Sequence, residues 1–239
     1  MHTSPRYYDL LEALPEQGCP ICRLIIRDRD RYLSSILYEY VNKHETNQAF
    51  RDGRGLCNSH MHLLMNRPGN SLGIAILNHA VMDELLTITA KSVQGNVSGL
   101  GRLLGLSSDQ HHSVADAISP VGPCLLCERM DATERSLLDV LSQTANDARL
   151  RDAFAQSPGG VCVPHTRIAL REFADAAVFW SLQRLHWQQL HAELQTFIEK
   201  NNRSIEQEDF GAEGDSWRRA IHYIAGEDGI FRLRRSPSK

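Results

Sequence analysis

Apolar residues recur every three or four positions in six stretches of this chain, which is the spacing of amphipathic α-helices. Stretches with this spacing are residues 4–14, 20–42, 72–90, 124–145, 172–201 and 217–225. Proline and glycine fall between several of them, where they end one helix and allow a turn before the next. The pattern predicts an all-α protein.

One cysteine–histidine motif occurs twice, with an offset of 105 residues between the copies. Each copy has a Cys-x2-Cys pair, then 34 intervening residues, then Cys-x2-His. The first copy is Cys19, Cys22, Cys57 and His60, and the second is Cys124, Cys127, Cys162 and His165. The motif uses all six cysteines of the chain. We therefore predict two pseudo-repeats, each stapled by its own Cys3His metal site.

The offset also predicts how the chain is divided. We expect an N-terminal helical repeat with the first metal site at 1–92 and a second helical repeat with the second site at 121–201. Residues 93–120, rich in glycine and serine, are expected to form a flexible connector. Residues 202–239 are expected to hold an acidic linker, a C-terminal helix and a basic tail.

The chemistry of the motif points to zinc. Thiolate and imidazole are the usual ligands of structural zinc, and a two-residue gap brings two side chains of one turn onto one metal. Each half-site is also predicted at a helix start, where unpaired backbone N–H groups stabilise thiolates. We expect two zinc ions, each joining two helix starts of one repeat. An iron–sulfur cluster is the alternative, although four thiolates are its usual ligands.

Other sites that use similar motifs fit less well. A thioredoxin-like Cys-x2-Cys pair needs a βαβ setting, and no strand pattern precedes either pair here. Attachment of c-type haem needs histidine directly after the second cysteine, where Arg23 and Glu128 stand. Four protein ligands also close a zinc site, whereas catalytic zinc keeps a position for water. An enzyme is therefore not favoured, and no catalytic residue is assigned.

Composition and charge limit the partners. The formal net charge of −3 gives no general attraction to nucleic acid or to an anionic membrane. The apolar runs are expected to be too short, or too interrupted by charge, to cross a bilayer. No secretion signal is recognised at the N-terminus, so a cytoplasmic, reducing location is expected. There, cysteine sets bind metal more often than they form disulfides.

A charged run interrupts the apolar stripe of residues 20–42. It comprises five alternating residues, Arg27, Asp28, Arg29, Asp30 and Arg31. We expect a solvated face with charge pairs three and four residues apart. In the alternative interpretation, one arginine–aspartate pair points inward.

The motif residues resemble those of a bacterial family of uncharacterised proteins that carry a duplicated CPxC…GxCxxH pattern. The resemblance rests on Gly18–Arg23, Gly55–His60, Cys124–Cys127 and Gly159–His165, with a C-terminal match at Ser216–Ala220. It implies that the eight motif residues act as a unit, and it implies no particular activity. Leu125 in the second copy replaces Pro20 of the first.

Two classes of function follow. In the first, zinc is structural and the helical body is an interaction or regulatory module whose partner is another protein. In the second, an iron–sulfur cluster or a switchable zinc thiolate makes the protein an electron carrier or a redox sensor. The sequence favours no particular oligomeric state.

Overall fold

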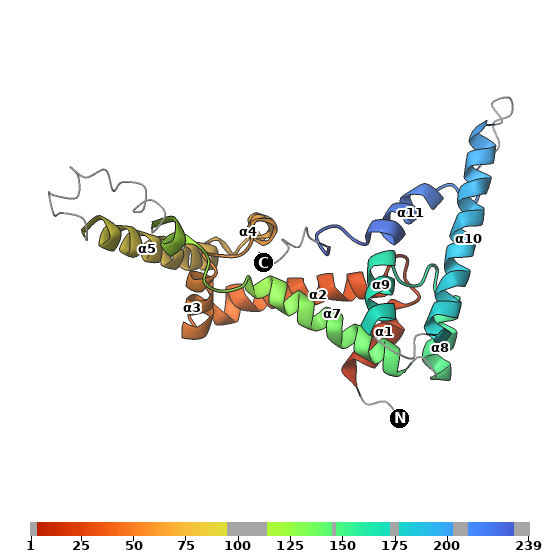
Figure 1. The fold of residues 1–239 in the computed structure, drawn as a ribbon, viewed down its shortest axis with the longest axis horizontal. Helices are drawn as coiled ribbons and strands as arrows, with labels where there is room; N and C mark the ends of the chain where they lie inside the picture. Colours follow the sequence, from red (N-terminus) through yellow and green to blue (C-terminus); the bar gives the residue numbers. More distant parts are fainter. Residues whose placement is uncertain (1–3, 95–113, 145–146, 173–176, 203–209, 232–239) are drawn as a thin grey trace. The chain divides into compact units, whose positions relative to one another are not determined.

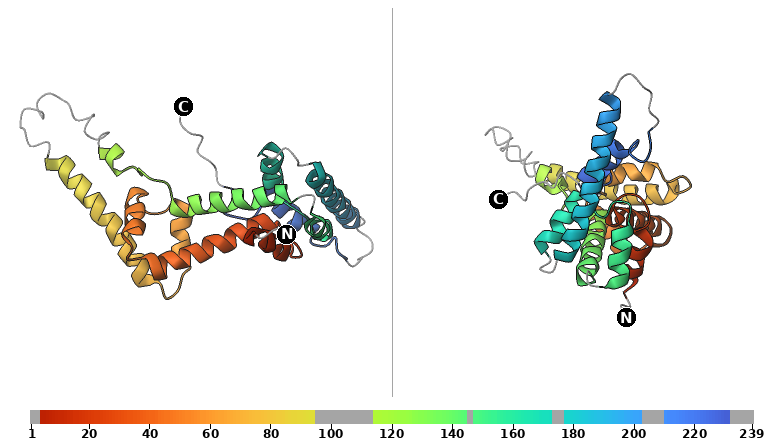
Figure 2. Two further views of the ribbon diagram at one scale, coloured as in Figure 1. Left: turned by 90° about the horizontal axis from the view of Figure 1, so that it is seen from below. Right: turned by 90° about the vertical axis from the view of Figure 1, so that its right-hand side faces the viewer.

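The computed structural model describes residues 4–94, 114–144, 147–172, 177–202 and 210–231. These ranges are helices joined by turns and contain no strand, so the predicted all-α class is confirmed (Figures 1 and 2). Most of the predicted connector, 95–113, lies outside the described residues.

Helices fall on all six predicted stretches, and the described residues contain further helices. In chain order they are α1 (Pro5–Ala13), α2 (Pro20–Ser35), α3 (His44–Asp52), α4 (Asn58–Met65), α5 (Ser71–Gln94), α7 (Leu125–Gln143), α8 (Ala148–Gln156), α9 (Val163–Glu172), α10 (Ala177–Asn202) and α11 (Ser216–Ala225). A π-helical turn, η1 (Ile36–Tyr40), continues α2.

Two compact units are present, and they cut across the sequence repeats. One contains residues 1–28 and 131–239, and the other contains residues 29–130. The boundaries fall inside α2 and α7, so each of these helices contributes residues to both units. The units therefore do not correspond to the expected repeats 1–92 and 121–201.

The first unit combines both ends of the chain. Within it, α11 packs against α9 and α10, and α8 packs against α10. Its fully buried apolar side chains include Leu10 of α1, Ile21 of α2 and Leu137 of α7. The unit therefore has a core to which the N-terminal helices and the second repeat both contribute.

The second unit is built on η1, α3 and α5, with α3 packed against α5. Its core contains Leu33, Phe50, Leu77 and the buried Leu126 from the beginning of α7. Leu126 belongs to the second repeat in sequence, yet its side chain is fully buried in this core. Each unit thus takes core residues from both repeats.

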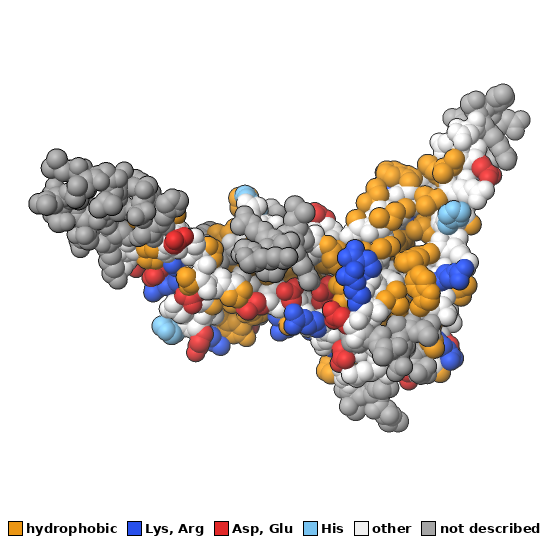
Figure 3. Space-filling view, viewed as in Figure 1, with side chains coloured by type: hydrophobic (Ala, Val, Ile, Leu, Met, Phe, Trp, Pro, Cys, Tyr) orange, Lys and Arg blue, Asp and Glu red, His pale blue; other side chains and the backbone are white. Residues whose placement is uncertain are grey.

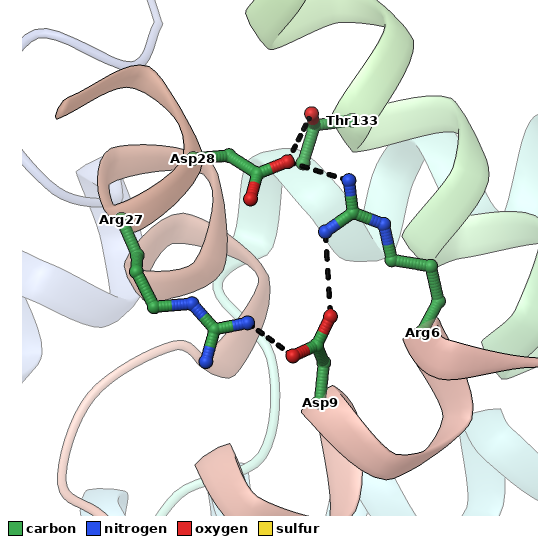
Figure 4. A network of polar contacts seen from close by, with 5 residues as sticks. All are labelled: Arg6, Asp9, Arg27, Asp28 and Thr133. Atoms are coloured by element: carbon green, nitrogen blue, oxygen red, sulfur yellow. Dashed lines mark hydrogen bonds and ion pairs between the residues drawn. The ribbon is translucent and has the colours of Figure 1, made fainter. Parts of the chain in front are cut away.

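The charged run of α2 is not wholly solvated, so the expected solvated face is wrong at Asp28. Only 8% of Asp28 is exposed. It accepts hydrogen bonds from Arg6 and from Thr133, and Arg6 also pairs with Asp9, which pairs in turn with Arg27 (Figure 4). A buried carboxylate needs such partners because desolvation of an isolated charge is costly.

One described helix departs from the expectation on membranes. Residues 71–90 of α5 are long and apolar enough to cross a bilayer, and 22% of their most apolar window is buried. The expectation that every apolar run is too short or too charged is therefore wrong for α5. Asp83 and Glu84 are the charged residues within this stretch.

Candidate metal centres

Every Cys-x2-Cys or Cys-x2-His half-site begins a helix. Cys19, Cys57, Cys124 and Cys162 directly precede α2, α4, α7 and α9. The carbonyl oxygen of each accepts a hydrogen bond from the backbone N–H four residues on, at Arg23, Met61, Glu128 and Thr166. These backbone bonds place each cysteine at the N-cap position, directly before the first residue of its helix. The predicted location of the half-sites at helix starts is confirmed.

A glycine turn leads into each Cys-x2-His half-site. Gly55 and Gly160 occupy equivalent places and have φ values of +89° and +67°. This left-handed region favours glycine, since other residues place a Cβ too near the backbone there. These turns connect α3 to Cys57 and α8 to Cys162, the first residues of the two Cys-x2-His half-sites.

The structure brings all eight predicted residues into two groups of four. Cluster 1 is Cys19, Cys22, Cys162 and His165, and cluster 2 is Cys57, His60, Cys124 and Cys127. Each therefore takes its Cys-x2-Cys pair from one repeat and its Cys-x2-His pair from the other. The expectation of one site within each repeat is wrong, although both ligand compositions remain Cys3His.

The pairing of half-sites from different repeats agrees with the division of the chain into two units. Cys19 and Cys22 lie in the unit formed by residues 1–28 and 131–239, and so do Cys162 and His165. The other four ligands lie between residues 29 and 130. Because α2 leads away from its cysteine pair into the other unit, the Cys-x2-His segment that follows belongs to that unit.

Cluster 1 is closely packed. His165 Nδ1 lies 3.5 Å from the sulfurs of Cys19 and Cys22 and 3.1 Å from that of Cys162. The sulfurs of Cys22 and Cys162 are 3.8 Å apart. One imidazole nitrogen therefore faces three thiol sulfurs.

Cluster 2 repeats the arrangement. His60 Nδ1 lies 3.4 Å from the sulfur of Cys124 and 3.9 Å from that of Cys127. The sulfurs of Cys127 and Cys57 are 3.9 Å apart. In both clusters all four ligand atoms lie within 4.8 Å of one another.

These separations suit a single tetrahedral ion. Metal–sulfur bonds of about 2.3 Å at tetrahedral angles place two sulfurs about 3.8 Å apart, and a nitrogen ligand lies slightly closer. A cubane is larger because each of its ligands binds a separate iron. The two clusters can therefore each hold one metal ion, with histidine binding through Nδ1.

A carboxylate supports the histidine of cluster 1. Glu134 on α7 is 9% exposed, and its Oε1 lies 3.0 Å from His165 Nε2. With Nδ1 facing the sulfurs, Nε2 carries the proton and can donate it to this oxygen. Such a partner fixes the tautomer and orientation of a metal-binding imidazole. The equivalent position in the first repeat is Arg29, whose guanidinium pairs with Asp30.

The residues of cluster 1 shift one another's pKa values. Burial alone would raise the pKa of the Cys19 thiol, but hydrogen bonds from Cys162 and Cys22 and the charge of His165 bring it well below its usual value. Burial would likewise lower the pKa of His165, but the charge of Cys19 and bonds to Cys162 and Glu134 raise it. A divalent metal would displace protons from these groups, so its binding depends on pH.

In cluster 2 the pKa of the Cys124 thiol is lowered. A hydrogen bond with Cys127 lowers the pKa of Cys124 to about 3, against the opposing effect of burial and with a further contribution from His60. A thiolate is the form that binds metal. The helix N-terminus at Leu125 adds its own favourable dipole.

The two clusters differ in exposure. All four residues of cluster 1 are buried, each at 1% exposure or less. The ring of Phe231 lies edge-on to His165, with ring centroids 4.7 Å apart, and a Cβ placed on Gly226 would be 3.5 Å from the Cys162 sulfur. In cluster 2 only His60 is buried, and its three cysteines are half-buried.

Comparison with known proteins identifies the group to which the chain is related. A family model described as "Family of unknown function (DUF6062)" matches residues 8–229. The chain belongs to this family. The match includes all eight cluster residues, in agreement with the resemblance inferred from the motif. Neither the search of curated proteins nor the search of solved structures found a match.

Sequence reasoning missed two residues that complete cluster 1, Glu134 and Phe231. Glu134 carried a usable signal, because it follows Met130 by four positions and precedes Leu137 by three. A carboxylate on the buried stripe of a helix requires a partner. Phe231 carried no such signal, since it follows the last helix and approaches His165 only in the folded chain.

Proposed function

We propose that this chain is a cytosolic zinc-binding protein in which two structural zinc ions hold a helical module that interacts with another protein. The observation that carries the proposal is the cross-repeat pairing of the two clusters. Each ion would join two helix N-termini that are distant in sequence, Cys19 with Cys162 and Cys57 with Cys124. Such a site contributes its binding free energy directly to folding.

The donor set supports zinc. Three thiolates and one imidazole are a common structural zinc set, and the ligand atoms are close enough for one ion. Three thiolates with one neutral imidazole leave a zinc site with a net charge of −1. The helix N-termini at each cluster stabilise that charge. A site with four protein ligands has no position for a substrate or water, so the proposal assigns no catalysis to either cluster.

The same cysteines support a cytoplasmic location as part of the proposal. All six are free thiols in the structure, although sulfurs lie as close as 3.8 Å. A reducing compartment preserves such thiols for metal binding, whereas an oxidising one favours disulfides. The proposal therefore places the protein in the cytoplasm.

A protein partner is part of the proposal because of one exposed helix face. Trp217, Ile221 and Ile224 of α11 are 43%, 57% and 66% exposed, and they are spaced as neighbours on one side of a helix. Apolar side chains gather over the part of the surface that carries α10 and α11 (Figure 3). An apolar helix face of this type is a common protein-docking element. Nucleic acid is not proposed, because the net charge is −3.

The test is metal analysis of protein purified without air and without added metal. The proposal predicts a colourless protein with about two zinc ions per chain, whose thiols resist alkylation until a chelator is added. Brown protein containing iron and acid-labile sulfide would overturn it in favour of an iron–sulfur protein. Protein with neither metal would overturn both.

A further inference from the structure

The two clusters contain the same ligand types but have different surroundings. Cluster 1 is buried, and Phe231 lies against its histidine. Cluster 2 has the same Cys3His composition, with three half-buried cysteines. A soluble oxidant can therefore reach the sulfurs of cluster 2 more easily, and oxidation of thiolates follows access as well as thiolate character.

The histidine of cluster 1 also has a carboxylate partner. His165 has the carboxylate of Glu134 at 3.0 Å, which strengthens an imidazole as a ligand. The burial of cluster 1 and the carboxylate beside His165 make cluster 1 the more strongly held site. The half-buried cysteines of cluster 2 make it the more accessible one.

We propose that cluster 2 is an oxidant-responsive zinc site, which releases its metal when a peroxide oxidises its thiolates, while cluster 1 remains loaded. This inference rests on the proposed function, since it requires zinc in both clusters. It deepens that function by assigning regulation to one cluster and structure to the other.

The reaction balances with a peroxide as the oxidant. The sulfurs of Cys57 and Cys127, 3.9 Å apart, give up two electrons and form one S–S bond, while both of their bonds to zinc break. Hydrogen peroxide would accept these two electrons together with two protons from the solvent, because zinc-bound thiolates carry no proton. Its O–O bond would break and two water molecules would form. Only Cys124 and His60 would then remain as ligands, and two ligands would hold a zinc ion too weakly to retain it. A disulfide needs the two sulfurs to approach to about 2.05 Å, which calls for local movement of α4 or α7.

Loss of metal from cluster 2 would affect only one of the two units. Cluster 2 ties the N-terminus of α4 to that of α7, and both half-sites lie within residues 29–130. Loss of its zinc would loosen this unit. The unit formed by residues 1–28 and 131–239 would keep its own metal through cluster 1. Oxidation would thus change one unit and leave the other folded.

The experiment uses the full chain loaded with two zinc ions and treated with hydrogen peroxide, with released zinc followed by a coloured chelator. We expect two phases of one zinc each, the first faster by at least about tenfold because of access. Peptide mapping after the first phase should find a disulfide between Cys57 and Cys127, with Cys19, Cys22 and Cys162 still reduced. Release of both ions at one rate, or first oxidation in cluster 1, would overturn the proposal.

A second variant tests whether Phe231, which lies against His165, shields cluster 1 without itself being a ligand. Replacing Phe231→Ala should speed the slow phase and leave the fast phase unchanged. Phe210→Ala is the matched control, because Phe210 is 49% exposed and its ring lies near Phe197. If the purified chain carried no zinc, the proposed function would fail. If it carried two zinc ions that left together, only the present inference would fail.

Discussion

Thr133 donates a hydrogen bond of 3.0 Å to Asp28, and these two residues are separated by 105 positions, the offset between the sequence repeats. Each is therefore the repeat counterpart of the other. The ligands follow the same rule of exchange, since the first cysteine pair meets the second Cys-x2-His and the second pair meets the first. Contacts of this reciprocal kind are typical of isologous pairing, here between two repeats of one chain.

The buried carboxylate in this contact predicts a stability effect. Asp28→Asn should lower the free energy of unfolding by about 1–3 kcal/mol, because Arg6 and Thr133 lose a charged acceptor in a buried setting. Asp30→Asn is the matched control, since the Asp30 side chain is 37% exposed and its change should stay within about 0.5 kcal/mol. Urea unfolding measures both. If both substitutions lowered the free energy of unfolding equally, the bonds of Asp28 to Arg6 and Thr133 would have no special part in stability.

The carboxylate beside His165 predicts a difference between the clusters. Glu134→Gln should weaken zinc binding at cluster 1 by about 10–100-fold, because the amide orients the imidazole less firmly. Cluster 2 should be unaffected. Competition with a chelator, with the two ions resolved by their rates, measures this. Arg29→Gln at the equivalent position of the first repeat is the control. If it weakened zinc binding by the same factor as Glu134→Gln, Glu134 would have no specific role.

The turns at Gly160 and Gly69 predict different losses of stability when glycine is replaced by alanine. Gly160→Ala combines a φ of +67° with a Cβ only 2.6 Å from Gln183 Oε1, so we expect it to lower the melting temperature clearly. Gly69→Ala, at φ +83° with nothing within 4 Å, isolates the backbone term of about 1 kcal/mol. Thermal unfolding should rank Gly160→Ala as the more damaging. The reverse order would mean that the turn before Cys162 is not tightly packed.

Most of the helices could be predicted from the sequence, because apolar spacing and proline positions act locally. The eight ligands could be predicted for the same reason, since the repeated spacing is visible in one dimension. Their pairing could not, because it depends on where α2 and α7 pass from one unit to the other. Either pairing gives two Cys3His sets, so the motif itself contains no information that separates them.

Asp28 and Glu134 show what local charge patterning leaves out. Both stand in polar bands that resemble solvated helix faces, yet Asp28 is 8% and Glu134 is 9% exposed. Asp28 follows Ile25 by three positions, and Glu134 follows Met130 by four, so each lies on the buried stripe of its helix. Their partners, Arg6 and His165, come from distant segments, and only the fold brings them together.

The central claim, that each metal is shared between the two repeats, is tested most directly by counting zinc in two double variants. Cys19→Ser with Cys162→Ser removes two ligands of one cluster, so the protein should retain about one zinc per chain. Cys19→Ser with Cys57→Ser removes one ligand from each cluster, so it should retain close to none. Both variants carry two substitutions of the same type, which makes each a control for the other. The opposite result, with zinc lost from the first variant and one ion kept by the second, would show that each repeat binds its own metal.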